Sequence, residues 1–143
     1  MESPTVQFHI LKTESVADKH RYIADLIAQL WQQHQQIQLW LPDLNTANEW
    51  DEYLWTYTPE RFLPHQVFDP ALPKPAPIVL VTGELSPTHI TLINLHHTLP
   101  TPMPETLTTV IEVVSQEPTD LVASRERYRG YQQLGCPLTT LKV

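Results

Sequence analysis

Glycine is scarce in this chain of 143 residues, which contains only Gly83, Gly130 and Gly135. Neither a G-x-G-x-x-G turn nor a G-x-x-x-x-G-K-[ST] loop can be built from these three positions. Such loops use glycine because the backbone must approach phosphate closely. The sequence therefore argues against binding of a dinucleotide or ATP through either motif.

Cysteine and long hydrophobic runs are also missing. The single cysteine, Cys136, cannot form an internal disulfide, and no apolar run approaches the roughly 20 residues of a membrane span. The N-terminal segment MESPTVQFHI has no basic stretch followed by a long apolar one, so we expect no secretory signal. Length and composition predict one domain over residues 1–143, in a reducing cytoplasm.

The seven histidines do not form a recognisable metal motif. Only His96 and His97 are adjacent, and no H-x-x-x-H or C-x-x-C pair occurs. Acidic residues cluster around the second predicted helix, at Glu49, Asp51, Glu52 and Glu60, without a glycine turn or a paired base. We interpret that cluster as a solvated helix face, and we predict no catalytic residue, no metal site and no cofactor.

Hydrophobic periodicity alternates between the strand and helix patterns along the chain. Strands are predicted at residues 5–11, 37–41, 62–68, 78–82, 90–95, 108–114 and 138–143, and helices at 15–35, 45–57 and 118–135. In the last helix, Thr119 or Asp120 is expected to cap the start and Gly130 or Gly135 to end it. This alternation predicts an α/β fold, a single three-layer α/β/α domain with a mostly parallel central sheet.

Basic residues are few, nine against sixteen acidic ones, and they concentrate near the C-terminus. On a helix, Arg125, Tyr128, Arg129 and Gln132 lie at i, i+3, i+4 and i+7 and share one face. Because the chain has a net charge of −7, this face suits an acidic peptide or a short anion better than a DNA duplex. A solvated helix face with salt bridges is the alternative.

Aromatic residues concentrate in residues 49–65, EWDEYLWTYTPERFLPH. Trp50, Tyr53, Trp55 and Tyr57 do not all fall on one side of a helix, so some of them are expected to face outward. Exposed aromatic residues beside a proline turn are typical of a protein-binding hot spot. Core packing is the alternative for each of them.

Two stretches resemble one protein family. WDEYLWTYTPERFLPH and SRERYRGYQQLGCPL, with the order and spacing of the predicted elements, resemble the chi subunit of bacterial DNA polymerase III holoenzyme. The resemblance covers almost the full chain. It implies a Rossmann-like fold and a non-catalytic accessory subunit of the clamp loader. That subunit binds the psi subunit and, separately, the acidic C-terminal tail of single-stranded-DNA-binding protein.

The resemblance also implies a residue-level site for the tail. Arg125 and Tyr128 would bind it, the guanidinium taking a carboxylate while the ring shelters the terminal apolar residue. The family has a lysine about one helical turn before this arginine, where the present chain has an apolar pair at residues 121–122. Either Arg129 or Lys142 takes its place, or tail binding is weaker.

For the psi subunit, the resemblance assigns contacts to Trp55, Phe62, Pro64 and His65. Both surfaces coincide with the basic and aromatic segments singled out from the residues alone.

Two other interpretations stay open at the level of sequence. One is a small α/β enzyme that uses Glu52 or His65 at a strand end. The other is a direct binder of single-stranded nucleic acid through Arg125, Arg127 and Arg129, which would show a steep dependence on salt.

Overall fold

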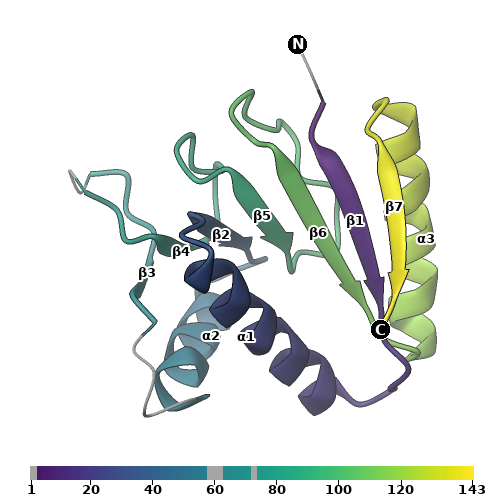
Figure 1. The fold of residues 1–143 in the computed structure, drawn as a ribbon, viewed down its shortest axis with the longest axis horizontal. Coiled ribbons are helices and arrows are strands. Elements are labelled where there is room, and N and C mark those ends of the chain that lie inside the picture. The colour runs from purple at the N-terminus through teal and green to yellow at the C-terminus, as the bar shows by residue number, and fades with distance from the viewer. Residues whose placement is uncertain (1–2, 58–62, 72–73) are drawn as a thin grey trace.

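The computed structural model describes residues 3–57, 63–71 and 74–143 (Figure 1). Within these ranges, helices and strands follow the predicted order. The elements are β1 (Thr5–Ile10), α1 (Val16–Gln32), β2 (Ile37–Trp40), α2 (Leu44–Tyr57), β3 (His65–Val67), β4 (Ile78–Val81), β5 (Thr91–Asn94), β6 (Thr109–Val114), α3 (Pro118–Gln133) and β7 (Leu138–Lys142). Phe62, where we expected the third strand to begin, lies outside the described residues.

The strands form one sheet in the order β3-β4-β2-β5-β6-β1-β7, and each neighbouring pair is parallel. Helices α1 and α2 cover one face of the sheet and α3 covers the other (Figure 1). The predicted three-layer, Rossmann-like α/β/α fold is thus confirmed, and β7 lies at one edge of the sheet.

Alternating side chains divide the core between the two faces of the sheet. On β6, Ile111 and Val113 belong to the cluster beneath α1 and α2, whereas Val110 and Val114 belong to the cluster beneath α3. Successive residues of a strand point to opposite faces, and β4, with the sequence IVLV, is apolar and buried at every position, as a parallel strand covered on both sides requires. Cys136 is buried in the cluster beneath α3.

The start of α3 differs from the expectation. Glu117 is the N-cap, because its carboxylate accepts hydrogen bonds from the backbone N–H groups of Thr119 and Asp120, at 3.1 and 3.0 Å. Pro118 follows at the first helical turn, where a missing N–H costs nothing. The prediction of Thr119 or Asp120 as the cap was therefore wrong by two or three residues.

Two glycines near the end of α3 have different roles. Gly135 has a φ of 77°, in the left-handed region that glycine adopts without steric cost, and it terminates the helix. Gly130 lies inside the helix, where a Cβ atom would overlap the side chain of Leu99. Its small size permits the loop before β6 to approach α3.

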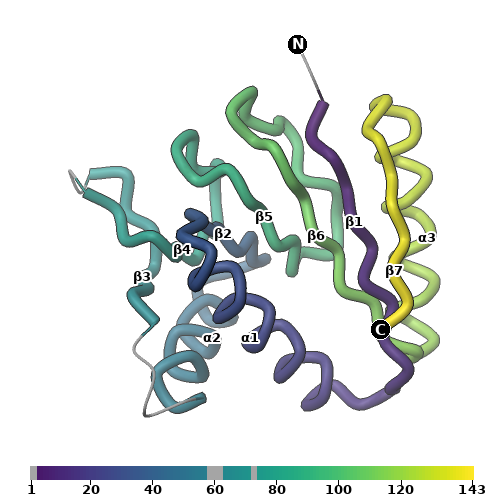
Figure 2. The backbone as a smooth tube through the Cα atoms, in the orientation of Figure 1, coloured from purple at the N-terminus to yellow at the C-terminus, as the bar shows by residue number. Residues whose placement is uncertain are grey.

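The two sequence segments singled out above lie far apart in the fold. Helix α2 packs beside β3 and β4 at one edge of the sheet, while α3 and β7 stand at the opposite edge (Figures 1 and 2). The aromatic and basic segments thus belong to opposite ends of the molecule.

Candidate functional site

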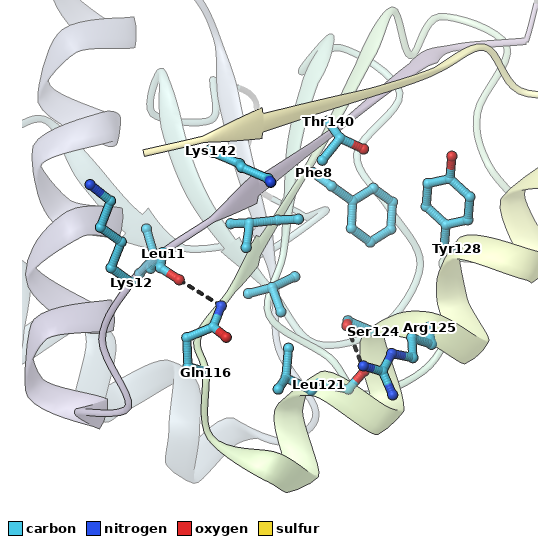
Figure 3. Close-up of a pocket in the computed structure, with 12 residues that line it drawn as sticks. Phe8, Leu11, Lys12, Gln116, Leu121, Ser124, Arg125, Tyr128, Thr140 and Lys142 are labelled. Atoms are coloured by element: carbon cyan, nitrogen blue, oxygen red, sulfur yellow. Dashed lines mark hydrogen bonds between the residues drawn. The ribbon is translucent and has the colours of Figure 1, made fainter.

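A cavity of about 660 Å³ opens between α3 and the strands β1 and β7 (Figure 3). Its floor is apolar and comes from three elements. The floor residues are Phe8, Ile10, Val114 and Leu121. Lys12, Arg125 and Lys142 also line the cavity, so positive charge surrounds an apolar base.

Regular periodicity places these side chains. Phe8 and Ile10 are two residues apart on β1, and Thr140 and Lys142 are two residues apart on β7, so each pair faces α3. On α3, positions 121, 125 and 128 follow the i, i+4, i+7 spacing of one helical stripe. The sheet and the helix thus present matching rows of side chains across the cavity.

Tyr128 forms a wall of the cavity that is fixed by packing. Its ring meets the buried ring of Phe8 edge to face, with centroids 5.2 Å apart and an interplanar angle of 63°. Such an aromatic pair contributes about 0.5–1.5 kcal/mol beyond the area that it buries. The half-buried Tyr128 ring is therefore positioned before any ligand arrives, beside an apolar base that can accept a ligand side chain.

The charge in the cavity is of one sign. Three of the chain's nine basic residues line it, and none of the acidic residues that the structure describes does. In the part of the chain that the structure describes, Lys12, Arg125 and Lys142 form no salt bridge. An acidic protein therefore has one apolar hollow bordered by uncompensated cations, which favours a ligand with both an anionic and an apolar group.

Only some of the residues expected at this basic site line the cavity. Arg125 and Tyr128 line the cavity together, and Lys142 joins them from β7. Arg129 is exposed on α3 outside the cavity lining. Lys12 was missed, although the alternation of β1 continued by two residues beyond Ile10 would have indicated it.

Arg127 lies in the interior and is only 7% exposed. Its Nε donates to Oε1 of Glu112 at 2.9 Å. The surface patch of three arginines, on which direct binding of nucleic acid depended, is therefore not formed, because the middle arginine is turned into the core.

The partner of Arg127 is a fully buried carboxylate. Oε2 of Glu112 accepts from the hydroxyl of Tyr131 at 2.6 Å and from Nδ2 of Asn94 at 2.8 Å. Burial raises the pKa of the Glu112 carboxyl, and Arg127 with the two hydrogen bonds opposes part of that rise. Burial, with the nearby Glu112, also raises the pKa of Tyr131. This network joins α3 to β5 and β6.

The aromatic segment divides into core and surface residues. Trp50 is buried in the cluster beneath α1 and α2, so core packing holds for it, whereas Trp55 is 53% exposed. The indole of Trp55 lies against the imidazole of His65, with ring centroids 4.8 Å apart. Pro64, which is half-buried, precedes β3 beside this pair. These residues form a second candidate surface, with Trp55 as its largest exposed group.

His65 is a buried residue that packs against the exposed Trp55. Its residue is 7% exposed, and its Nδ1 and Nε2 lie 2.6 and 3.1 Å from the main-chain oxygens of Leu63 and Asp51. Because His65 is buried, a direct contact between His65 and a partner does not fit the structure. The packing of His65 against the indole instead orients Trp55. A neutral imidazole can donate to only one of these two carbonyls, and it is the burial of the ring that disfavours His65 as a general base.

The carboxyl ends of the strands are where open α/β sheets usually bind ligands. Here a crevice of about 370 Å³ lies between the N-termini of α1 and α3. Its Lys19 pairs with Asp120 at 2.8 Å, and the carboxylate of Glu117 caps α3. A phosphate would meet carboxylates at this helix terminus, which weakens the enzyme interpretation.

The described residues contain no group of three or more histidine, cysteine, aspartate or glutamate side chains placed to hold a metal ion. Within the same ranges, no helix is both long enough and apolar enough to cross a membrane.

Comparison with known proteins agrees with the resemblance found in the two sequence stretches. The model of the family described as DNA polymerase III chi subunit, HolC, matches residues 3–139. A protein of Pseudomonas aeruginosa named DNA polymerase III subunit chi is 30% identical over 134 residues, which cover 93% of this chain and 92% of that protein. A protein of Haemophilus influenzae with the same name is 28% identical over 142 residues, covering 97% of each. The chain therefore belongs to the DNA polymerase III chi subunit family and has an accessory role in replication.

Proposed function

We propose that this protein is a non-catalytic adaptor of the replicative polymerase. In this proposal, the cavity between α3, β1 and β7 binds the acidic C-terminal tail of single-stranded-DNA-binding protein. The surface around Trp55 binds the psi subunit and, through it, the clamp loader. The protein would thus connect the clamp loader to coated single-stranded DNA in the cytoplasm.

One observation carries the proposal for the tail. Among the residues described, the cavity combines the apolar floor beside Tyr128 with three cations and no lining carboxylate. A peptide that ends in an apolar residue after several acidic ones presents the complementary groups, a side chain for the floor and carboxylates for the rim. A guanidinium can take a carboxylate through two parallel hydrogen bonds, so Arg125 suits the terminal carboxylate.

The proposal for psi rests on Trp55. A tryptophan with half of its surface exposed, beside Pro64 and with its ring tilted against a buried histidine, has the character of an interface anchor. Large aromatic residues in a fixed orientation lose little conformational entropy when a partner covers them. The assignment of Phe62 to this surface also stays a proposal, and that residue lies outside the described ranges.

The location of the two surfaces supports a linking role. Because they belong to opposite edges of the sheet, two partners could bind without overlapping. A protein that holds two partners raises their effective concentration with no chemistry of its own.

Fluorescence anisotropy of a labelled peptide with the sequence of the tail tests the first half of the proposal. Loss of a charge-assisted hydrogen bond costs about 1.5–3 kcal/mol, so Arg125→Ala should weaken binding by roughly ten-fold or more. Lys74→Ala is the control, because Lys74 is an exposed cation outside the cavity. Absence of binding by the unmodified protein, or an equal effect of both substitutions, would reject this site.

A further inference from the structure

The face of the sheet that α3 covers is not protected by a helix along its whole width. Helix α3 stands at the β7 edge (Figure 1), and the connections from β4 to β5 and from β5 to β6, which the structure describes in full, contain no helix. These two loops pack against the same face through Leu85, Leu99 and Met103. A cavity of about 520 Å³ remains between them, next to Trp40, the last residue of β2.

This second cavity is apolar, with two acidic residues on its lining. Its apolar lining residues are Trp40, Leu85, Pro102, Met103 and Pro104. Glu84 from the first loop and Glu105 from the second also line it, and no basic residue among those described does. Neither glutamate forms a salt bridge within the described ranges. The cavity thus joins an apolar surface to two uncompensated negative charges, the opposite sign to the cavity beside α3.

Trp40 is held in a fixed orientation. Its indole stacks on the imidazole of His96, with ring centroids 4.2 Å apart and an interplanar angle of 20°. Its Nε1–H donates to the main-chain oxygen of Gly83 at 3.1 Å. The polar atom of the ring is therefore satisfied inside the protein, and the half-buried ring presents apolar surface to the cavity. Such a surface attracts both an apolar side chain and a cation.

A buried glutamine fixes the loop that follows β4. Gln38 lies within β2 and is fully buried. Its Oε1 accepts from the N–H of Ser86 at 2.8 Å, and its Nε2 donates to the carbonyls of Ser86 and His89 at 3.0 and 2.8 Å. The second loop is joined to the first where Oγ1 of Thr106 donates to the carbonyl of Pro87 at 2.6 Å. The walls of the cavity are thus ordered before a partner arrives, which lowers the entropic cost of binding.

We infer that this cavity is a docking site for a basic segment of a partner protein, in which an apolar side chain lies next to arginine or lysine. The apolar side chain enters the cavity against Trp40 and Met103. The flanking cations meet Glu84 and Glu105. Charge complementarity sets the class of partner, since an acidic peptide or a nucleic acid would bring negative charge toward both glutamates. The lining residues are distinct from those of the cavity beside α3 and from the surface around Trp55, so this site does not depend on the proposed function.

Nuclear magnetic resonance of the ¹⁵N-labelled protein tests the inference, with the indole N–H signal of Trp40 as the reporter. Trp40→Phe assigns this signal among those of the four tryptophans. Two end-blocked peptides are titrated, Ala-Arg-Phe-Arg-Ala and its uncharged analogue Ala-Gln-Phe-Gln-Ala. The titrations use the unmodified protein and the double variant Glu84→Gln with Glu105→Gln. A second double variant, Glu14→Gln with Glu126→Gln, is the matched control, since both glutamates are exposed outside the cavity and the net charge changes equally.

The cationic peptide should shift the Trp40 signal and the backbone amide signals of both loops, and it should bind more tightly than the uncharged peptide. Removal of Glu84 and Glu105 should weaken its binding about three- to ten-fold, as expected for two exposed ion pairs. This difference should shrink as salt is added. The control variant should bind the cationic peptide as the unmodified protein does.

Any one of four outcomes would reject the inference. The first is that neither peptide shifts the Trp40 signal. The second is an equal loss of binding in both double variants, which would show only a general attraction of an acidic chain for cations. The third is equal binding of the two peptides, because the glutamates would then not select the ligand. The fourth is a shift of the loop signals with protein concentration alone, which would identify a second copy of this chain as the occupant.

Discussion

Arg125 and Arg127 are two positions apart on α3 and have opposite environments. Arg125 lines an open cavity, while Arg127 is buried against Glu112. The first is available to a ligand and the second holds the fold together. Removal of one partner from a buried ion pair leaves an uncompensated charge, which usually destabilises a protein by about 3–5 kcal/mol.

Arg127→Met should therefore lower the free energy of unfolding by about 3–5 kcal/mol, measured by urea denaturation at neutral pH. Arg129→Met is the control, because substitution at an exposed position usually changes stability by less than about 0.5 kcal/mol. Equal effects of the two substitutions would contradict a structural role for Arg127.

The loss of stability in Arg127→Met is also expected to depend on pH. Burial raises the pKa of Glu112, and loss of Arg127 raises it further. A carboxyl whose pKa is higher in the folded state than in the unfolded state binds more protons when the protein is folded. It therefore destabilises the fold once the pH rises above its pKa in the unfolded state. The deficit of Arg127→Met should be smallest in acid and should grow with pH, which denaturation at several pH values would show. A deficit independent of pH would point to lost packing instead.

The burial of Arg127 could not be predicted from the sequence alone. Helical periodicity places residues 125 and 127 on different sides of α3, but it does not say which side meets the sheet. That depends on Glu112, an acidic residue within an otherwise apolar strand, and on the hydroxyl of Tyr131. For the same reason, the sequence did not decide whether Trp50 and Trp55 are buried or exposed. The burial of each depends on which elements pack against α2.

At the scale of elements, Asp120 connects α3 to α1 and to the end of β6. One oxygen, Oδ2, accepts from Nζ of Lys19 and from the backbone N–H and hydroxyl of Ser115, each at 2.8 Å. Burial alone would raise the pKa of Asp120, but the hydrogen bonds from Lys19 and Ser115 outweigh it and hold the pKa below its usual value. The ionised form is thus the one that stabilises the fold.

Asp120→Asn should cost about 1.5–3 kcal/mol at neutral pH, because hydrogen bonds to a charged group are lost. A depressed folded pKa gives stability that is present above the unfolded pKa and is lost as pH falls through the folded pKa. Unfolding of both proteins should therefore be compared at neutral pH and in acid, where the difference should decline. Asp18→Asn is a control on α1, since Asp18 is exposed. A difference that persists in acid would contradict this account.

The elements themselves were largely predictable. The helices and strands that the structure describes agree with the predicted ranges to within about three residues at each end, because periodicities of 2 and 3.6 are local properties. The order of the strands was not predictable, since pairing joins residues far apart in the chain. The cavity depends on that order, because Phe8 and Ile10 lie beside Thr140 and Lys142 only through the pairing of β1 with β7.

At the scale of the whole molecule, the two candidate surfaces lie at opposite edges of a single sheet. The account therefore predicts that they act independently. Residues with no shared partners usually have additive effects on free energy. Substitution at one surface should leave affinity at the other unchanged, and occupation of one should not block the other.

The most direct test is titration of the labelled tail peptide into this protein alone and into its complex with psi, with Arg125→Ala and Trp55→Ala compared in both assays. The account predicts similar tail affinity with and without psi. Arg125→Ala should lose only the tail, and Trp55→Ala should lose only psi. Competition between psi and the peptide, or a loss of both partners from either substitution, would contradict an adaptor with two separate surfaces.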